Sequence, residues 1–323
     1  MKHPILGLHH VTATVNDAQE DLDFYRRTLG LRLIKRTVNF DNPRVYHFYY
    51  GDERGTPGAI WTTFPYQGWG VARGQHGRGQ ITRTTFAVPT GALDFWTPRL
   101  ARQGVVTEEA AGWSGSPTIR FEDPSGLAIE LIENRDDLRE PWTGSGISAE
   151  HAIRGLHSVR LRLAHAERTV RLLTDLLGFE QVAEENEIIR LAVNGDVPGH
   201  RVELAAGTGG PEGRNGLGTV HHVAMAIATP EEQVKLRHEL IGLGYSVTEV
   251  LDRQYFQSIY FREPGGVLFE VATVGPGFTV DEPLAELGLA LKLPPWEEPN
   301  RSSIEEHLPR ISPPPPLQRP RPG

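Results

Sequence analysis

One structural unit occurs four times along this chain of 323 residues, and we call each copy a module. Each module begins with a strand-like run, continues with a helix-like segment of about three turns, and ends in further strands. The opening strands are Leu8–Val15, Ile81–Val88, Gly155–Leu163 and Thr219–Ile227. A repeat of this kind decides the architecture before any single motif does. It predicts an α+β fold of four βαβββ modules with curved mixed sheets.

The four modules fall into two halves of similar length. Modules one and two occupy residues 1–134, and modules three and four occupy residues 152–274. Residues 135–151 between them include EPWTGSGISAE, which has the composition of a linker. Residues 275–323 form a Pro-rich tail, where PPPP is incompatible with a helix or a central strand. We expect two tandem domains followed by this tail, with IEEHLPRI as a short docked helix.

The chain contains no cysteine, so any bound metal must be held by His, Asp or Glu. These ligands favour Fe(II), Mn(II) or Zn(II). The formal charge of -8 comes from intermixed acids and bases without a dense basic face, so we do not expect nucleic acid as a partner. The chain has no apolar leader and no apolar run of about 18 residues. We therefore expect a cytoplasmic protein without a membrane partner. The sequence leaves open whether it forms a homo-oligomer.

Two of the opening strands carry a His-His pair, and strand alternation separates the two members of each pair. Successive side chains of a strand point to opposite faces of the sheet. In module one, His9 falls on the Val/Ala face that a helix would cover, and His10 falls on the polar face. In module four, His221 falls on the bulky apolar face and His222 on the opposite one. We expect His10 and His222 to point into the concave side.

A carboxylate completes this set. In the closing strand GGVLFEVAT of module four, alternation places Glu270 on the inward face. A single strand His or Glu is more often a hydrogen-bonded core residue than a ligand. Here, however, the two histidines hold the same position in two modules. Two His and one carboxylate on a concave face form the facial triad of non-haem iron.

The other two modules lack an equivalent set. Module three has Ser158 where a histidine would fall, and module two has Thr85 or a near neighbour there. Glu130 of module two matches Glu270, but no second histidine stands in a place to join it. The sequence therefore predicts one metal site, formed across the two halves by His10, His222 and Glu270.

The segments that carry these residues resemble the vicinal oxygen chelate superfamily, whose paired βαβββ units hold a divalent metal. Within it, Lys35–Pro65 and the run DRQYFQSIYFREPGG are similar to ring-cleaving dioxygenases of the chlorohydroquinone and hydroquinone 1,2-dioxygenase type. The likeness extends from about residue 5 to residue 274. It implies an Fe(II)-dependent, extradiol-type enzyme of aromatic compound degradation, with Mn(II) as the alternative ion. Its partners would be O2 and a small aromatic substrate of the hydroquinone or catechol type.

The resemblance places the metal ligands on the three residues that alternation selects. Its supporting and substrate-contacting positions fall on His9, Thr12, His221, Arg253 and Tyr260. Simple alternation turns His9 and His221 away from the site, and a bulge near the strand start would reconcile the two.

Two of these positions have clear chemical roles in the expected site. Tyr260 is expected to offer a proton or a hydrogen bond to a bound oxygen. Arg253 either binds an anionic substrate or pairs with Asp252 or Glu249 at the surface. We also consider four aromatic residues as pocket lining: Trp61, Phe64, Trp69 and Trp113.

Two other functions are open on the same scaffold. A glyoxalase-type isomerase or lyase needs a fourth protein ligand, commonly a second Glu, but module one has Thr62 and Thr63 at that place. A non-catalytic resistance protein that binds an aromatic compound has no use for an inward set of metal ligands. The residues alone do not choose between hydroquinone and catechol; only the resemblance favours hydroquinone.

Overall fold

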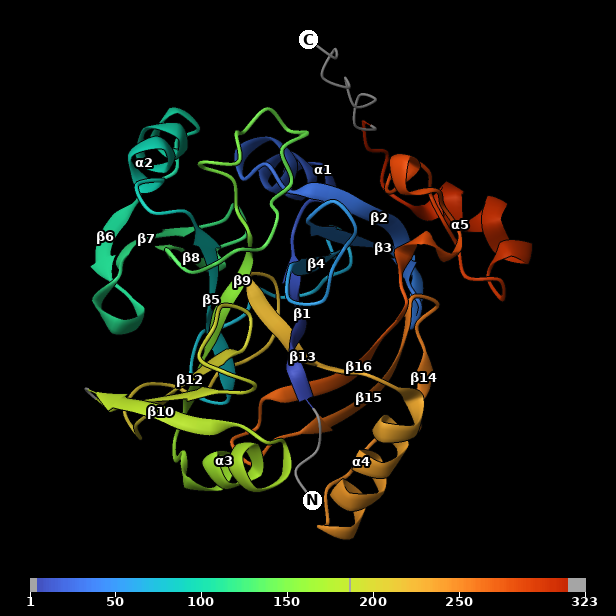
Figure 1. The fold of residues 1–323 in the computed structure, drawn as a ribbon. Coiled ribbons are helices and arrows are strands. Elements are labelled where there is room, and N and C mark those ends of the chain that lie inside the picture. The colour runs from blue at the N-terminus through green and yellow to red at the C-terminus, as the bar shows by residue number, and fades with distance from the viewer. Residues whose placement is uncertain (1–4, 186, 313–323) are drawn as a thin grey trace.

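The computed structural model describes residues 5–185 and 187–312, and it confirms the α+β class (Figure 1). The strands form two curved sheets of eight strands each. The order in the first sheet is β14 (Leu251–Asp252), β15 (Phe256–Arg262), β16 (Leu268–Pro276), β13 (Thr219–Ile227), β1 (Ile5–Val15), β4 (Ile60–Pro65), β3 (Asn42–Gly51) and β2 (Arg32–Asn39). The order in the second is β10 (Glu180–Glu185), β11 (Ile188–Ala192), β12 (Arg201–Ala206), β9 (Gly155–Leu163), β5 (Gln80–Val88), β8 (Ala128–Glu133), β7 (Pro117–Glu122) and β6 (Glu108–Ala111).

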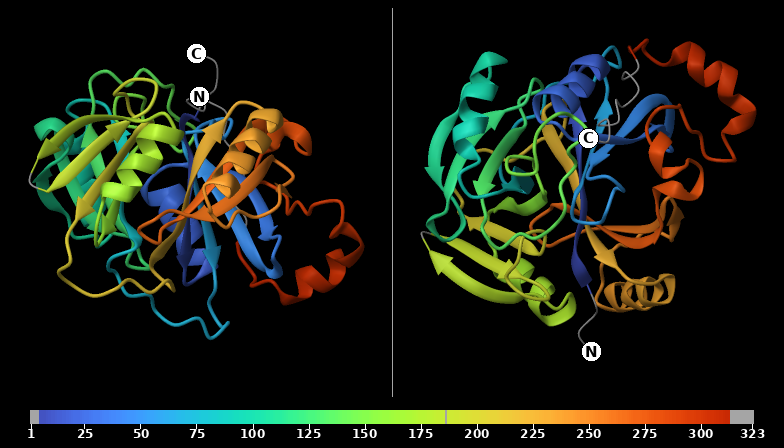
Figure 2. Two further views of the ribbon diagram at one scale, coloured as in Figure 1. Left: turned by 90° about the horizontal axis from the view of Figure 1, so that it is seen from below. Right: turned by 45° about the horizontal axis from the view of Figure 1, so that its top comes forward.

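Each sheet combines one module from each half of the chain. Antiparallel pairing of β1 with β13 joins modules one and four, and antiparallel pairing of β5 with β9 joins modules two and three. Figure 2 shows the two sheets side by side, with blue and orange strands in one and green and yellow strands in the other. The module repeat is therefore observed, while the domain boundaries at residues 134 and 152 stay a prediction.

One helix belongs to each module and packs its apolar side chains into the core. The helices are α1 (Ala18–Asp23), which continues as a π-helical turn over Phe24–Thr28, α2 (Leu93–Arg102), α3 (Glu167–Arg171), which continues over Leu172–Leu176, and α4 (Pro230–Gly242). Asp17 caps α1 by accepting a hydrogen bond from the Glu20 amide, and Thr229 caps α4 in the same way. Within the described residues, no helix has the length and apolar content needed to cross a membrane.

Within each half, the helical segment of one module forms a hydrogen bond with a hairpin turn of the other module. Tyr25 lies in the π-helical turn that follows α1. Its hydroxyl donates a hydrogen bond at 2.9 Å to Asp123 Oδ2, in the turn between β7 and β8. Thr169, in α3, donates to Glu263 Oε2 in the turn between β15 and β16 at 2.5 Å. Modules therefore pair through strands across the halves and through these helix contacts within each half.

The tail covers the open edge of the first sheet. Lys35 of the edge strand β2 is fully buried and forms ion pairs with Asp281 and Glu282 of the tail. The expected docked helix is present as α5 (Arg301–His307), whose Ile304 packs into the core. In Figure 1 this red segment lies beside β2 and β3. Such cover protects an edge strand from pairing with another chain. The part of the Pro-rich tail at 313–323 lies outside the described residues.

Helix α1 carries a buried carboxyl group, that of Asp21, on the side that faces the first sheet. Asp21 Oδ2 accepts hydrogen bonds from Tyr50 Oη and Thr63 Oγ1, both at 2.7 Å. Its second oxygen, Oδ1, is buried and has no hydrogen-bond partner among the described residues. Burial raises the pKa of Asp21 to about 8, although the two hydroxyl donors act in the opposite direction. The folded protein therefore keeps this group protonated at neutral pH.

This group makes stability depend on pH in a defined window. The folded protein retains the Asp21 proton up to about pH 8, whereas the unfolded chain loses it near its ordinary pKa of about 4. Between these values the unfolded state binds fewer protons, so the free energy of unfolding falls as pH rises, by up to ~1.4 kcal/mol per pH unit. We expect Asp21→Asn to remove this contribution in urea unfolding measured from pH 5 to 9. Asp23→Asn, on the exposed side of the same helix, should keep it; parallel curves for the wild type and Asp21→Asn would contradict the assignment.

Candidate metal centre

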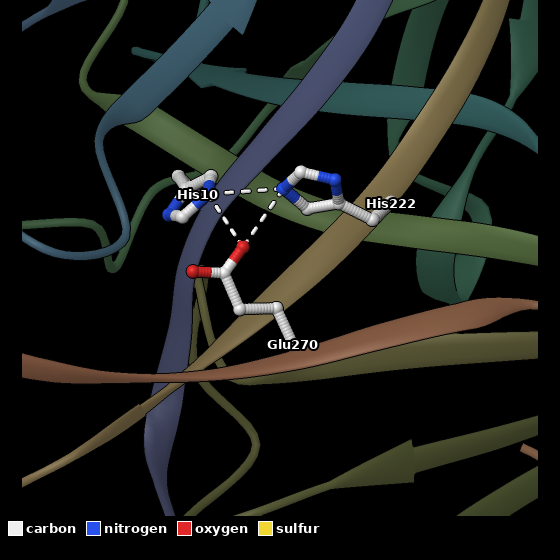
Figure 3. Close-up of side chains that lie close together, drawn as sticks. All are labelled: His10, His222 and Glu270. Carbon is white, nitrogen blue, oxygen red and sulfur yellow. Dashed lines mark hydrogen bonds and ion pairs between the residues drawn. The ribbon is translucent and has the colours of Figure 1, made fainter. Parts of the chain in front are cut away.

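Three adjacent strands of the first sheet bring the predicted ligand atoms together. Ala224 of β13 pairs with His10 of β1 on one side and with Glu270 of β16 on the other. His222 lies two residues before Ala224 and therefore on the same face. The Nε2 atoms of His10 and His222 are 3.3 Å apart, and Glu270 Oε2 lies 3.2 and 2.8 Å from them (Figure 3). All three side chains are buried.

The chemistry of this group fits a divalent cation. Glu270 Oε1 accepts a hydrogen bond from Ser258, but Oε2 accepts none from the residues that the structure describes, although it is buried and close to both imidazoles. Burial acts to raise the pKa of Glu270, yet His10 and His222 hold it well below its usual range. Burial lowers the pKa of His222. An ionised carboxylate and a neutral imidazole are the forms that bind a metal. Among the described residues, this is the one cluster of His, Asp or Glu with such geometry.

Each of the two histidines is held by the histidine before it. His10 Nδ1 lies 2.8 Å from His9 Nδ1, and His222 Nδ1 lies 2.7 Å from His221 Nδ1. For Nε2 to offer its lone pair to a cation, the proton of a neutral ring must sit on Nδ1, which then donates to the neighbouring ring. Burial, with the adjacent histidine, lowers the pKa of His9 and of His221 to about 3, so both neighbours remain neutral acceptors. The pairs thus fix the orientation of the inward imidazoles.

The placement of His9 and His221 on the apolar face by simple alternation is wrong. The register between β1 and β13 shifts between Leu8 and His10, which leaves His9 as an extra residue. A second shift follows Thr12: Thr12 pairs with His222 and Ala13 with Val220, so His221 is the extra residue on β13. A bulge inserts one residue and rotates its side chain relative to strict alternation. Both histidines therefore lie beside the ligand set, where the resemblance places them.

Loss of one supporting histidine should weaken metal binding without removing a ligand. We expect His221→Phe to lower the affinity for Fe(II) by about 10- to 100-fold, the usual effect of removing the partner of a metal-bound imidazole. His157 is the matched control, because it precedes Ser158 and lies at the corresponding register shift of the second sheet. His157→Phe should leave the affinity unchanged in competition with a chromogenic chelator. Equal affinities for the two variants would contradict the proposed orientation.

The concave side of the second sheet is filled by ion pairs instead. Glu130, the counterpart of Glu270, accepts hydrogen bonds from Thr85 at 2.8 Å and from Arg120 at 2.7 Å, and it also pairs with Arg83. In module three, Glu203 pairs in the same way with two arginines, Arg160 and Arg190. Arginine supplies the positive charge that a metal would supply, and within residues 5–185 and 187–312 no histidine joins either carboxylate there.

A cavity of about 470 Å³ opens onto the ligand set. This volume is in the range of small-molecule sites. Its walls are formed by His10, Asn39, Phe40, Asp41, His47, Tyr49, Phe64, Tyr66, His221, His222, Thr248, Leu251, Arg253, Phe256, Tyr260 and Leu268. Of the four aromatic residues expected there, Phe64 alone lines it. Trp61 is buried on the opposite face against Tyr25, Trp69 is 41% exposed, and Trp113 packs on arginines of the second sheet.

One wall of the cavity carries Tyr260 and Arg253 from module four. Tyr260 pairs with Glu270 across β15 and β16, and its ring centroid lies 5.6 Å from that of His222. The Arg253 guanidinium lies 5.3 Å from the Tyr260 ring centroid and forms an ion pair with Asp41 at 3.0 Å. Surface pairing of Arg253 with Asp252 or Glu249 is therefore wrong, since Glu249 pairs with Arg237. The Arg253–Asp41 pair joins modules one and four at the cavity.

The other wall contains a residue that the sequence analysis missed. His47 and Tyr49 of β3 line the cavity, whereas Phe48 and Tyr50 of the same strand are fully buried in the core. His47 contacts Thr62, which in turn contacts the predicted site residue Thr12. Alternation in VYHFYYGD was the available signal, because it places His47 and Tyr49 on one face.

Comparison with known proteins identifies the family. The model of the Glyoxalase/Bleomycin resistance protein/Dioxygenase superfamily matches residues 7–131 and 155–271. The chain belongs to this superfamily, which confirms the resemblance drawn from the repeated modules.

Several relatives align with this chain over nearly its whole length. The chain is 44% identical over 309 residues to "Putative ring-cleaving dioxygenase MhqE" of Bacillus subtilis (strain 168), an alignment that covers 94% of this chain and 99% of that one. It is 36% identical over 300 residues to "Chlorohydroquinone/hydroquinone 1,2-dioxygenase" of Sphingobium indicum, with 90% and 92% covered. A crystal structure of a Bacillus subtilis protein described as a "putative dioxygenase" matches with a TM-score of 0.91 and 39% identity, over 97% of this chain and 99% of that chain.

Proposed function

We propose that the protein is an Fe(II)-dependent, extradiol-type dioxygenase that opens the ring of a hydroquinone-type aromatic compound with O2. The observation that carries this proposal is the convergence of His10 Nε2, His222 Nε2 and Glu270 Oε2 at an aromatic-lined cavity. Two neutral imidazoles and one carboxylate are the usual facial ligands of non-haem Fe(II), and Mn(II) is the alternative ion. The relative that is named as acting on chlorohydroquinone and hydroquinone supports this substrate class.

The charges of the site favour an ionised substrate hydroxyl. Bound Fe(II) would supply open coordination positions and electron transfer between the aromatic ring and O2. Glu270 alone among the three ligands is negative, so it offsets only part of the charge of a divalent ion. With the ion held by these residues, a ring hydroxyl at this centre would lose its proton more readily than in water. The reaction adds both atoms of O2 to the ring, breaks one ring carbon–carbon bond next to a hydroxyl-bearing carbon, and requires no other reductant.

The cavity walls would hold the aromatic ring of the substrate and supply a hydrogen-bond donor to its oxygen atoms. Tyr260 is half-buried beside Glu270, and desolvation of its hydroxyl, together with that carboxylate, raises the pKa of the hydroxyl above its ordinary value. Tyr260 therefore stays protonated and can donate a hydrogen bond to oxygen near the ligand set. Arg253, charged and fixed by Asp41, helps to orient the tyrosine ring. Phe64, Phe256 and Phe40 exclude water around an aromatic ring.

The isomerase alternative lacks its fourth ligand. Thr62 of β4 occupies the place in module one that Glu270 occupies in module four, since Thr62 pairs with Tyr49 as Glu270 pairs with Tyr260. The Thr62 hydroxyl is engaged by Thr12 and His47. A hydroxyl in place of a carboxylate does not complete a glyoxalase-type set.

The direct test is oxygen uptake by metal-reconstituted protein. The protein is loaded anaerobically with Fe(II) or Mn(II), and hydroquinone, chlorohydroquinone or catechol is added in an oxygen electrode. We expect uptake with the hydroquinones and Fe(II), in a one-to-one ratio to substrate. Absence of uptake with every phenol and both ions would refute the dioxygenase function and leave an aromatic-binding protein as the explanation.

A further inference from the structure

His47 occupies a position that matches Ser258 on the opposite side of the site. Ser258 precedes Tyr260 by two residues and donates to Glu270, while His47 precedes Tyr49 by two residues and contacts Thr62. In the sheet order, β3 and β15 lie on opposite sides of the central pair β1 and β13, separated from it by β4 and by β16. His47 therefore belongs to the wall that faces Tyr260 across the ligand set.

Contacts with its own strand and with β4 hold the His47 ring in place, and β1 supports the β4 contact. Its Nε2 lies 2.9 Å from Thr62 Oγ1, and Thr62 Oγ1 lies 2.7 Å from Thr12 Oγ1. The ring also sits between two aromatic neighbours, with centroid distances of 4.0 Å to Tyr49 and 4.2 Å to Phe64. A histidine fixed in this way by packing and hydrogen bonding presents its remaining ring nitrogen in a constant direction.

The remaining nitrogen of His47 is available to a ligand. Within the part of the chain that the structure describes, Nδ1 forms no hydrogen bond, and the side chain lines the cavity. Burial, with His10, His222 and Arg253 nearby, lowers the pKa of His47 well below its ordinary value. The ring is therefore neutral, and the two threonine hydroxyls can rotate so that Nδ1 either donates or accepts a hydrogen bond.

We propose that His47, held by Thr62 and Thr12, binds the second ring hydroxyl of a 1,4-dihydroxybenzene whose first hydroxyl lies at the His10–His222–Glu270 centre. This assignment rests on the proposed function and adds the residue that selects its substrate. A 1,2-diol carries both hydroxyls on one side of the ring and cannot place one at the centre and the other at the far wall. His47 thus acts as a specificity determinant that contacts substrate.

Binding without turnover tests this role. Dissociation constants for hydroquinone and for phenol are measured by titration calorimetry on Fe(II)-loaded protein under anaerobic conditions. We expect the wild type to bind hydroquinone about tenfold more tightly than phenol, the effect of one hydrogen bond. His47→Phe should lose this preference through weaker hydroquinone binding alone, with phenol binding and iron content unchanged. His47→Gln, which retains donor and acceptor atoms, should restore part of it.

The outcomes separate this inference from the proposed function. An unchanged hydroquinone-to-phenol ratio in His47→Phe, or an equal loss for both ligands, would overturn the role of His47 even if the wild type consumes O2. A lost preference in His47→Phe without O2 uptake by the wild type would contradict the proposed function alone. If His47→Phe does not fold, Thr62→Val removes the Nε2 partner of His47 and must reduce the same ratio.

Discussion

Glu270→Gln is expected to lose its metal and, with it, all ring-opening activity. The substitution keeps the shape of the side chain but removes the only negative charge among the three ligands. Removing a direct ligand should lower metal affinity by more than the 10- to 100-fold typical of a supporting residue. We expect desalted Glu270→Gln to contain almost no iron by elemental analysis and to consume no O2 with hydroquinone.

Two residues of the second sheet provide matched controls. Glu130→Gln alters the counterpart carboxylate, which Arg120 and Thr85 already engage, and should retain wild-type iron content. In the same way, His222→Ala should abolish iron retention while Ser158→Ala should not. Equal iron content in Glu270→Gln and Glu130→Gln, at equal folded fraction, would contradict the placement of the site.

Tyr260→Phe should slow turnover and leave the metal in place. The tyrosine hydroxyl is the proposed proton donor on the strand next to Glu270, and loss of such a group typically costs 10²- to 10⁴-fold in rate. We therefore expect kcat to fall by about 10²-fold or more, with unchanged iron content and a much smaller change in KM. Steady-state oxygen uptake with hydroquinone measures this split.

Tyr49 is the matched control for Tyr260. It lines the same cavity from module one, but it stands opposite Thr62 instead of a carboxylate. Tyr49→Phe should change kcat only slightly. Similar losses in both variants, or loss of iron from Tyr260→Phe, would show that Tyr260 acts through packing and not through its hydroxyl.

The convergence of the three candidate ligands could be predicted from the sequence because both of its signals are local. Alternation within a strand assigns His10, His222 and Glu270 to one face from their immediate neighbours. The module repeat then aligns strands that are far apart in the chain. Neither signal needs any knowledge of how the strands pair.

Long-range pairing and strand irregularity could not be predicted in this way. The two bulges that bring His9 and His221 to the site arise from the register between β1 and β13, which no single strand encodes. Arg253 and its partner Asp41 are 212 positions apart in the chain. Local sequence offered only nearer acids for this arginine, and pairing of modules one and four brings the distant one to it.

The aromatic lining shows the same limit. Tryptophans stand out in a sequence, but their large rings fill cores equally well. Trp61 lies on the covered face of β4, whereas Phe64 lines the cavity. The residues that complete the cavity, including His47 and Phe256, depend on which strands become neighbours.

The most direct measurement for the central claim is the fate of labelled oxygen. Fe(II)-loaded protein is given hydroquinone under ¹⁸O2, and the product is analysed by mass spectrometry. We predict a ring-opened product that contains both atoms of one O2 molecule, formed by the wild type and by Glu130→Gln but not by Glu270→Gln. A product with an intact ring, a product with a single labelled atom before any exchange with water, or equal yield from Glu270→Gln would contradict a ring-opening dioxygenase built on His10, His222 and Glu270.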